Sequence, residues 1–202
     1  YQVLAQRYFD EPRFSYISGL ARLSPYDKLV RHYADTYDFD WRLIVAQMYR
    51  ESQFDPGAIS AGGALGLMQL TPDTARAMGV ANPFDPDAGI RGGIRYLHKL
   101  RSYFEVGLPP RERTWFALAA YNAGPTRVVQ ARARASAAGL DPNRWFGSVE
   151  TMMGRMPNQR AIGPYREAVD YVRAIRSLYN TYNRQHESLT AGLERGARTP
   201  RS

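Results

Sequence analysis

Signals that start an α-helix recur along this chain and constrain its fold more than any other feature. Ser, Thr and Asp are favoured just before a helix because their oxygens accept hydrogen bonds from its first backbone N–H groups, and Pro suits the first helical position. Apolar residues at helical spacing follow these signals, and no stretch shows a sustained strand alternation. We expect helices to start at Ser24-Pro25, Asp40, Thr71-Pro72, Asp87, Arg111, Gly124-Pro125 and Pro164. The fold class is therefore all-α, with a loop or short hairpin in the Gly- and Ala-rich stretch 58–65.

The chain divides into a helical middle and two different ends. Residues 1–23 contain aromatic side chains but no long periodic pattern, so we interpret them as a connector or the remnant of a preceding domain. Residues 24–186 form the single folded domain, and residues 187–202 are polar and basic and are expected to be disordered. No apolar stretch is long enough to span a bilayer. Because the chain begins at Tyr1 rather than Met, we interpret it as a piece of a longer protein.

A glycine pair, Gly92-Gly93, falls inside the helix that we expect to follow Asp87. Glycine in a helix interior is unfavourable by about 1 kcal/mol relative to alanine. The pair therefore predicts that another backbone packs closely against this helix.

Composition limits the partners. The formal net charge of +8 favours attraction to polyanions such as nucleic acid, an anionic membrane surface or an acidic polysaccharide. The absence of cysteine excludes disulfides and thiol nucleophiles, and His32, His98 and His186 are too dispersed to suggest a metal site. We expect neither a metal nor a cofactor.

Glu51 ends an apolar helical face. Trp41, Ile44, Val45 and Met48 share one stripe of the helix that Asp40 begins, and Glu51 falls beside Ile44 on that stripe. A carboxyl group partly removed from water favours its protonated form and can act as a general acid near neutral pH. Spacing alone also allows an ordinary helix-terminal glutamate that pairs with a neighbouring arginine.

Four short motifs follow one another in a specific order: Glu51-Ser52, then Gly66-Leu67-Met68-Gln69, then Ala120-Tyr121-Asn122, and finally Glu167-Ala168-Val169-Asp170-Tyr171. In this order and at these separations they resemble the catalytic domain of the soluble-type (family 1, SLT-domain) lytic transglycosylases, which are related in fold to goose-type lysozyme. The resemblance covers residues from about 24 to 180. Within that family the chain looks most like the C-terminal module of the membrane-bound lytic murein transglycosylase F group, in which a solute-binding-like domain precedes the module.

The resemblance implies a lysozyme-like helical fold and a reaction. Glu51 would protonate the glycosidic oxygen between N-acetylmuramic acid and N-acetylglucosamine in peptidoglycan, and then act as base while the muramoyl C6 hydroxyl closes on C1. The product is a 1,6-anhydromuramoyl end. Such a reaction needs one carboxyl group rather than two, because the nucleophile belongs to the sugar. Asp55, just before Pro56, suits a turn better than a second acid.

The remaining motif residues would bind the glycan strand. The resemblance assigns this role to Ser60, Gly66, Met68, Gln69, Tyr121, Asn122, Glu167 and Tyr171. Gly66 would permit close backbone approach, and Met68 would offer an apolar contact to a sugar ring, although a core position is an equal alternative for it. Ala168 stands where the family has threonine, which weakens the assignment of Glu167.

Three alternatives stay open. A goose-type hydrolase would use water in place of the C6 hydroxyl, and a non-catalytic module would bind peptidoglycan without turnover. A nucleic-acid-binding module would explain the charge, but the sequence contains no basic-aromatic motif for it. On the favoured interpretation the enzyme is periplasmic, and the full-length protein is associated with the outer membrane through an anchor or targeting segment outside this sequence.

Overall fold

The computed structural model describes residues 22–104, 107–156 and 164–197. These residues are almost entirely helical, and the β-type pairing among them is limited to two isolated antiparallel bridges, Ile59 with Leu65 and Leu65 with Leu70. The elements are α2 (Asp27–Thr36), α3 (Trp41–Ser52), α4 (Pro72–Ala77), α5 (Pro86–Tyr103), α6 (Pro110–Ala123), α7 (Pro125–Ala137), the π-helical turn η1 (Trp145–Val149), α8 (Glu150–Gly154) and α9 (Pro164–Ala197). The predicted all-α class is confirmed, and the stretch 58–65 is the loop that carries the bridges.

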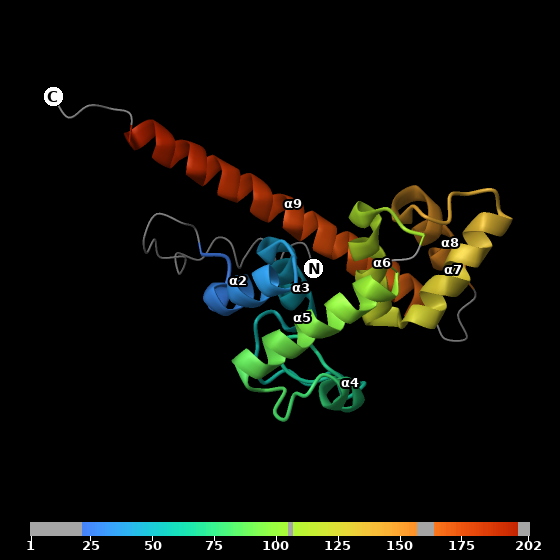
Figure 1. The fold of residues 1–202 in the computed structure, drawn as a ribbon, viewed down its shortest axis with the longest axis horizontal. Coiled ribbons are helices and arrows are strands. Elements are labelled where there is room, and N and C mark those ends of the chain that lie inside the picture. The colour runs from blue at the N-terminus through green and yellow to red at the C-terminus, as the bar shows by residue number, and fades with distance from the viewer. Residues whose placement is uncertain (1–21, 105–106, 157–163, 198–202) are drawn as a thin grey trace.

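Helix α9 runs along the length of the molecule and contacts both of its halves (Figure 1). It packs against α3 and α6 through Ala168, Val172 and Ile175, which are fully buried. Helices α7 and α8 lie near its N-terminal end, while its C-terminal turns run past α2 and α3 (Figure 1). Because α9 contacts both α3 and α6, it can bring together side chains that are far apart in the sequence.

The glycine pair in α5 is the point where residues on both sides of α4 pack on the helix. A Cβ at Gly93 would lie 2.5 Å from the Met68 Cβ, and one at Gly92 would lie 2.3 Å from a Val80 methyl group. Real Cβ atoms do not approach other atoms so closely, so only glycine fits at either position. The predicted close packing is confirmed, but the side chains of Met68 and Val80 make it rather than another backbone.

The beginnings of two helices differ from the sequence prediction. Helix α2 begins at Asp27 rather than at Pro25, because the Asp27 carboxylate turns back and accepts hydrogen bonds from Ser24 N and Ser24 Oγ. Helix α5 is capped by Asp85, whose side chain accepts from Ala88 N, and not by Asp87. Asp87 instead accepts a hydrogen bond from the Tyr33 hydroxyl of α2.

Helix α9 continues to Ala197, into the segment from residue 187 for which the sequence predicts disorder. Ala, Leu, Glu and Arg in this segment favour helix intrinsically, and an existing helix adds each further turn without a new nucleation step. The residues interpreted as a connector lie, up to residue 21, outside the described part of the chain.

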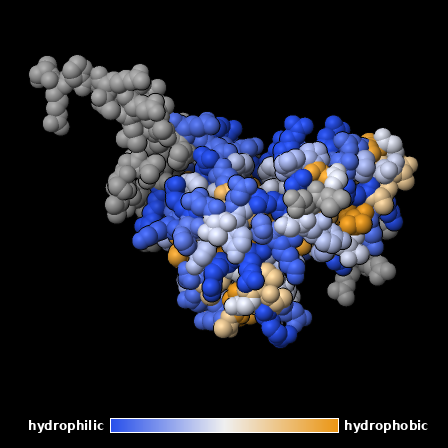
Figure 2. Space-filling model, in the orientation of Figure 1, coloured by the Kyte–Doolittle hydropathy of each residue, from blue (hydrophilic) through white to orange (hydrophobic). Residues whose placement is uncertain are grey.

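The surface is mostly hydrophilic on the face shown in Figure 2, and its hydrophobic residues lie in small separate groups. Large hydrophobic side chains that are exposed among the described residues are Ile59, Phe84, Tyr103 and Val129. Within the same residues, no helix is both long and apolar enough to cross a bilayer.

Candidate active site

Helix α3 carries Glu51 in its last turn. Asp40 begins the helix as predicted, with its side chain accepting a hydrogen bond from Arg42 N at 2.9 Å. The residues between Leu43 and Met48 are buried, so the helix is held on nearly all sides. The chain turns sharply after Ser52, because Gln53 and Phe54 adopt left-handed backbone conformations that are unusual for side chains with a Cβ. Glu51 therefore lies at the end of a rigid helix, where the chain leaves the core.

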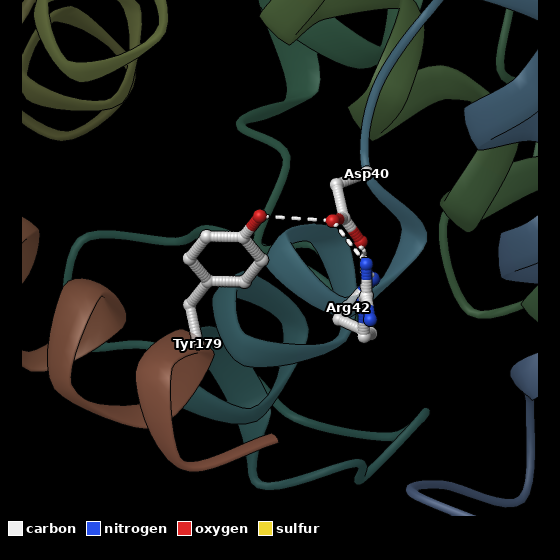
Figure 3. Close-up of polar contacts among 3 residues, drawn as sticks. All are labelled: Asp40, Arg42 and Tyr179. Atoms are coloured by element: carbon white, nitrogen blue, oxygen red, sulfur yellow. Dashed lines mark hydrogen bonds and ion pairs between the residues drawn. The ribbon is translucent and has the colours of Figure 1, made fainter. Parts of the chain in front are cut away.

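Helix α9 also holds the N-terminal end of α3. The Tyr179 hydroxyl points toward Asp40 and donates to its Oδ2 at 2.8 Å, while Arg42 donates to both carboxylate oxygens of Asp40 (Figure 3). Burial alone would raise the pKa of Asp40, but the hydrogen bonds from Arg42 and Tyr179 hold it below its ordinary value. The Asp40 carboxylate thus stays charged and ties α3 to α9.

The Glu51 carboxyl group accepts one short hydrogen bond. The Tyr171 hydroxyl of α9 donates to Glu51 Oε1 at 2.5 Å, and Tyr171 itself is buried. The pKa of Glu51 is raised from its ordinary 4.5 to about 7, mainly by burial and to a smaller extent by nearby Glu167, although the Tyr171 hydrogen bond and Arg50 oppose the rise. At neutral pH both the acid and its carboxylate are therefore populated, as a group that must first donate and then accept a proton requires.

The loop between α3 and α4 is fastened beside Glu51 by side-chain bonds to its backbone. Ser52 Oγ donates to Leu67 O at 3.0 Å, and the Tyr121 hydroxyl of α6 donates to Met68 O at 2.8 Å. The Gln69 side-chain Nε2 donates to the backbone carbonyl oxygens of Ala58 and Gly66, and the side-chain Oε1 takes part in neither bond. Three elements, α3, α6 and the loop, thus meet at one place.

Gly66 and Met68 have roles in this loop that differ from each other. Gly66 has a φ of +71°, and a Cβ there would lie 2.0 Å from the Pro83 carbonyl oxygen, so the close approach expected of it is to another part of the chain. The Met68 side chain is fully buried against Gly93, so it presents no surface to a sugar ring. The core alternative for Met68 is the one that the structure supports, and the Met68 backbone carbonyl is the atom that faces Tyr121.

The other predicted residues lie on three elements, the loop between α3 and α4, α6 and α9. Ser60 is exposed in the loop, where its Oγ accepts from Ala64 N at 3.0 Å. Asn122 follows Tyr121 near the C-terminal end of α6 and is partly buried. Glu167 is exposed one turn before Tyr171 and lies near enough to Glu51 to raise its pKa.

Asp55 occupies a turn, as expected. It is exposed and accepts a hydrogen bond from Gly57 N at 2.8 Å. Within the described residues, no three or more His, Asp and Glu side chains form a group that could hold a metal ion.

Two residues at the site were missed by sequence reasoning. Gln47 is fully buried one turn before Glu51, and Tyr96 of α5 packs its ring 5.1 Å from that of Tyr121. The spacing of four residues between Gln47 and Glu51 was a signal, since it places both on one helix face. Tyr96 had no comparable signal, because helix α5 carries no motif of the resemblance.

The domain is all-helical, and the Glu51 carboxyl group lies at the end of a buried helix. This group accepts a hydrogen bond from a tyrosine, and its pKa is raised to near neutrality. Such a group is suited to general acid–base chemistry. A family model described as the transglycosylase SLT domain matches residues 28–142, more than half of the chain. The chain belongs to this family, the SLT-domain lytic transglycosylases, which are enzymes.

Its relatives include two named membrane-bound lytic murein transglycosylase F. The one from Stutzerimonas stutzeri is 41% identical over 166 residues, which cover 79% of this chain and 34% of the relative. The one from Shewanella loihica is 37% identical over 190 residues, which cover 88% of this chain and 40% of the relative. The chain thus spans about a third of the length of these relatives, and the resemblance to the F group is confirmed.

Two solved structures are similar in fold. The 70-kDa soluble lytic transglycosylase of Escherichia coli superposes with a TM-score of 0.63 at 25% identity, covering 91% of this chain and 27% of that one. An inactive Glu-to-Gln mutant of the lytic transglycosylase Slt from Pseudomonas aeruginosa has a TM-score of 0.59 at 26% identity, covering 80% and 24%. The similarity to the E. coli enzyme confirms the predicted lysozyme-like helical fold.

Proposed function

We propose that this domain cleaves the β-1,4 bond between N-acetylmuramic acid and N-acetylglucosamine in peptidoglycan and leaves a 1,6-anhydromuramoyl end. The observation that carries the proposal is the Glu51 carboxyl group, which has a pKa of about 7 and accepts a 2.5 Å hydrogen bond from Tyr171. The names of the relatives, which describe lytic murein transglycosylases, agree with it.

In this mechanism Glu51 acts twice, first as an acid and then as a base. In the first step its protonated carboxyl group transfers the proton to the glycosidic oxygen, so that the bond from that oxygen to C1 breaks and the leaving sugar departs as an alcohol. In the second step the carboxylate removes the proton of the muramoyl C6 hydroxyl, whose oxygen forms a bond to C1. Glu51 ends the cycle protonated, and no water is consumed.

Tyr171 supports the charged form that arises between the two steps. Its hydroxyl donates to Glu51 Oε1, and a hydrogen bond to a carboxylate is stronger than one to the neutral acid. Arg50 also favours the carboxylate, whereas burial and Glu167 favour the acid. The balance places the pKa near neutrality, where both proton transfers are accessible.

The glycan strand would lie along the surface where the α3–α4 loop, α6 and α9 meet. Ser60 and the free side-chain oxygen of Gln69 would bind it from the loop, and Asn122 from α6. Gly66 and Tyr121 would shape this surface through the backbone of residues 66–69, and Glu167 would border it on α9.

The location and partners follow from the substrate. We place the enzyme in the periplasm, with the full-length protein at the outer membrane, and we expect a solute-binding-like domain to precede it. Relatives named membrane-bound support a membrane association. The net charge of +8 would hold the domain on peptidoglycan, whose stem peptides are acidic.

Mass spectrometry of the muropeptides released from purified sacculi tests the proposal. The protein and a Glu187→Gln control, which changes an exposed glutamate on α9, are expected to release products about one water lighter than their reducing-end counterparts. The Glu51→Gln variant is expected to release none. Reducing-end products would instead identify a goose-type hydrolase, and an active Glu51→Gln protein would place the acid elsewhere.

A further inference from the structure

Gln47 is a polar residue in the most buried part of α3. Its side chain has no exposed surface, and neither its Nε2 nor its Oε1 has a hydrogen-bond partner among the residues that the structure describes. A buried amide without partners destabilises a fold, and an apolar residue of the same size would avoid this loss. The position therefore calls for an explanation other than stability.

The surroundings of Gln47 indicate what it faces. Gln47 and Glu51 are four residues apart on α3 and lie on the same side of the helix. That side packs against α9, where the buried Tyr171 hydroxyl reaches Glu51. Burial raises the pKa of Tyr171 well above its ordinary value, while the Gln47 amide lowers it, which is the effect of an N–H directed at the phenol oxygen.

We propose that Gln47 is a positioning residue for the reaction, which aligns the Tyr171 hydroxyl toward Glu51 by directing its side-chain N–H at the Tyr171 oxygen. A phenol has one proton to donate and two lone pairs to accept with. Tyr171 gives its proton to Glu51, so its oxygen remains available to an amide donor. The hydrogen bond from Gln47 to Tyr171 and the one from Tyr171 to Glu51 then form a chain, in which each bond polarises and strengthens the other.

The bond from Gln47 would become closest when Glu51 is charged. Catalytic hydrogen bonds are often long in the absence of substrate and shorten as charge develops. An amide outside hydrogen-bond geometry in the resting site agrees with such a role. This inference rests on the proposed function of Glu51 and adds a residue that acts through Tyr171, without touching the substrate.

Other groups also act on Glu51 and set the background for a test. Arg50 on α3 favours its carboxylate, Glu167 on α9 opposes it, and Tyr121 on α6 is close enough to respond to its charge. None of them is changed by a substitution at Gln47. A shift in the pKa of Glu51 on substitution of Gln47 can therefore be attributed to the Tyr171 hydroxyl if it occurs in the wild type but not in Tyr171→Phe.

The decisive experiment is an NMR titration of the Glu51 carboxyl carbon in the wild type, Gln47→Met, Tyr171→Phe and the double variant. Gln47→Met is expected to raise the pKa of Glu51 by a few tenths of a unit, because cooperative strengthening adds roughly 10–30% to a hydrogen bond. In the Tyr171→Phe background the same change is expected to add nothing. Gln47→Leu repeats the test with a different side-chain shape, and Gln185→Met, on the exposed surface of α9, serves as the control.

Two further readouts separate positioning from a structural role. Gln47→Met is expected to keep or raise the melting temperature, while kcat falls several-fold and KM stays unchanged. The inference is overturned if Gln47→Met leaves the pKa of Glu51 at the wild-type value, or shifts it equally with and without the Tyr171 hydroxyl. The titration needs no turnover, so a failure of the proposed function would appear separately, as the absence of anhydro products from the wild type.

Discussion

Tyr171 and Glu51 are 120 residues apart in the sequence, yet the Tyr171 hydroxyl donates a 2.5 Å hydrogen bond to the Glu51 carboxyl group. Eight residues further along α9, Tyr179 donates to Asp40 at the opposite end of α3. One helix thus holds both ends of the helix that carries the acid, and the position of Glu51 depends on the packing of α9 against α3.

The rate of glycan cleavage is expected to fall above about pH 7, since Glu51 must be protonated to donate and its pKa is about 7. Above that pH, kcat/KM should decrease about tenfold per pH unit. Tyr171→Phe removes a bond that favours the carboxylate, so this limb should move to higher pH while the maximal rate falls. The pH dependence of anhydromuropeptide release measures both effects, and a limb that stays in place in Tyr171→Phe would contradict the role of Tyr171.

Glu51→Gln is expected to become more stable relative to the wild type as the pH rises. The pKa of Glu51 is about 7 in the folded protein and 4.5 ordinarily, so between these values the folded protein keeps a proton that the unfolded chain releases. Wild-type stability therefore decreases from pH 4.5 to 7, by about 2 kcal/mol for a group that water partly reaches. Glutamine does not titrate and escapes this loss.

Urea unfolding at pH 5 and at pH 8 tests this expectation. The free energy of unfolding of Glu51→Gln minus that of the wild type should be more positive at pH 8 than at pH 5. For Gln185→Met, which changes no titratable group on the exposed surface of α9, the difference should be the same at both values. An equal difference for Glu51→Gln at both pH values would mean that Glu51 titrates normally in the fold.

Tyr121→Phe is expected to lower activity more than stability. The Met68 carbonyl loses its hydrogen bond from the Tyr121 hydroxyl, which lowers the free energy of unfolding by about 1 kcal/mol. The backbone of residues 66–69 would then be held less firmly beside Glu51, and kcat/KM should fall at least tenfold. Chemical denaturation and product release measure the two quantities, and full activity in Tyr121→Phe would show that this bond does not position the loop.

Gly93→Ala is expected to destabilise the protein by about 1–3 kcal/mol, as overpacking in a rigid core does. The new methyl group would lie 2.5 Å from the Met68 Cβ, which belongs to the backbone-proximal part of the loop and cannot move aside alone. Gly154→Ala in α8 is the matched control, because the nearest atom to its Cβ is a Val169 methyl group at 4.0 Å. Thermal unfolding of both variants checks the prediction, which a stable Gly93→Ala protein would contradict.

Binding to sacculi is expected to weaken as ionic strength rises, since the net charge is +8 and the polymer is acidic. Co-sedimentation of Glu51→Gln with sacculi at increasing salt measures this without degradation of the polymer. Binding that does not change with salt would show that the charge has another use.

The sequence by itself determined the helices and the position of the acid within one of them. Helical periodicity and capping depend on residues a few positions apart, so Asp40, Thr71 and the face that ends at Glu51 could be recognised locally. The glycine pair in α5 also indicated close packing, because no other residue tolerates it. Local signals were weaker where two aspartates could cap the same helix, as Asp85 and Asp87 could for α5. They were also weaker at the start of α2, where the Asp27 carboxylate accepts a hydrogen bond from the preceding Ser24.

Only the tertiary structure decided which side chains meet at Glu51. The packing of α9 on α3 brings Tyr171 to the acid and Gln47 to Tyr171, and the packing of α5 on the loop turns the Met68 side chain into the core and its carbonyl toward Tyr121. The pKa of Glu51 follows from the same packing, because burial and the charges of neighbouring helices raise and lower it. Such contacts join residues far apart in the chain, and their geometry is set by how whole helices fit together rather than by any local pattern.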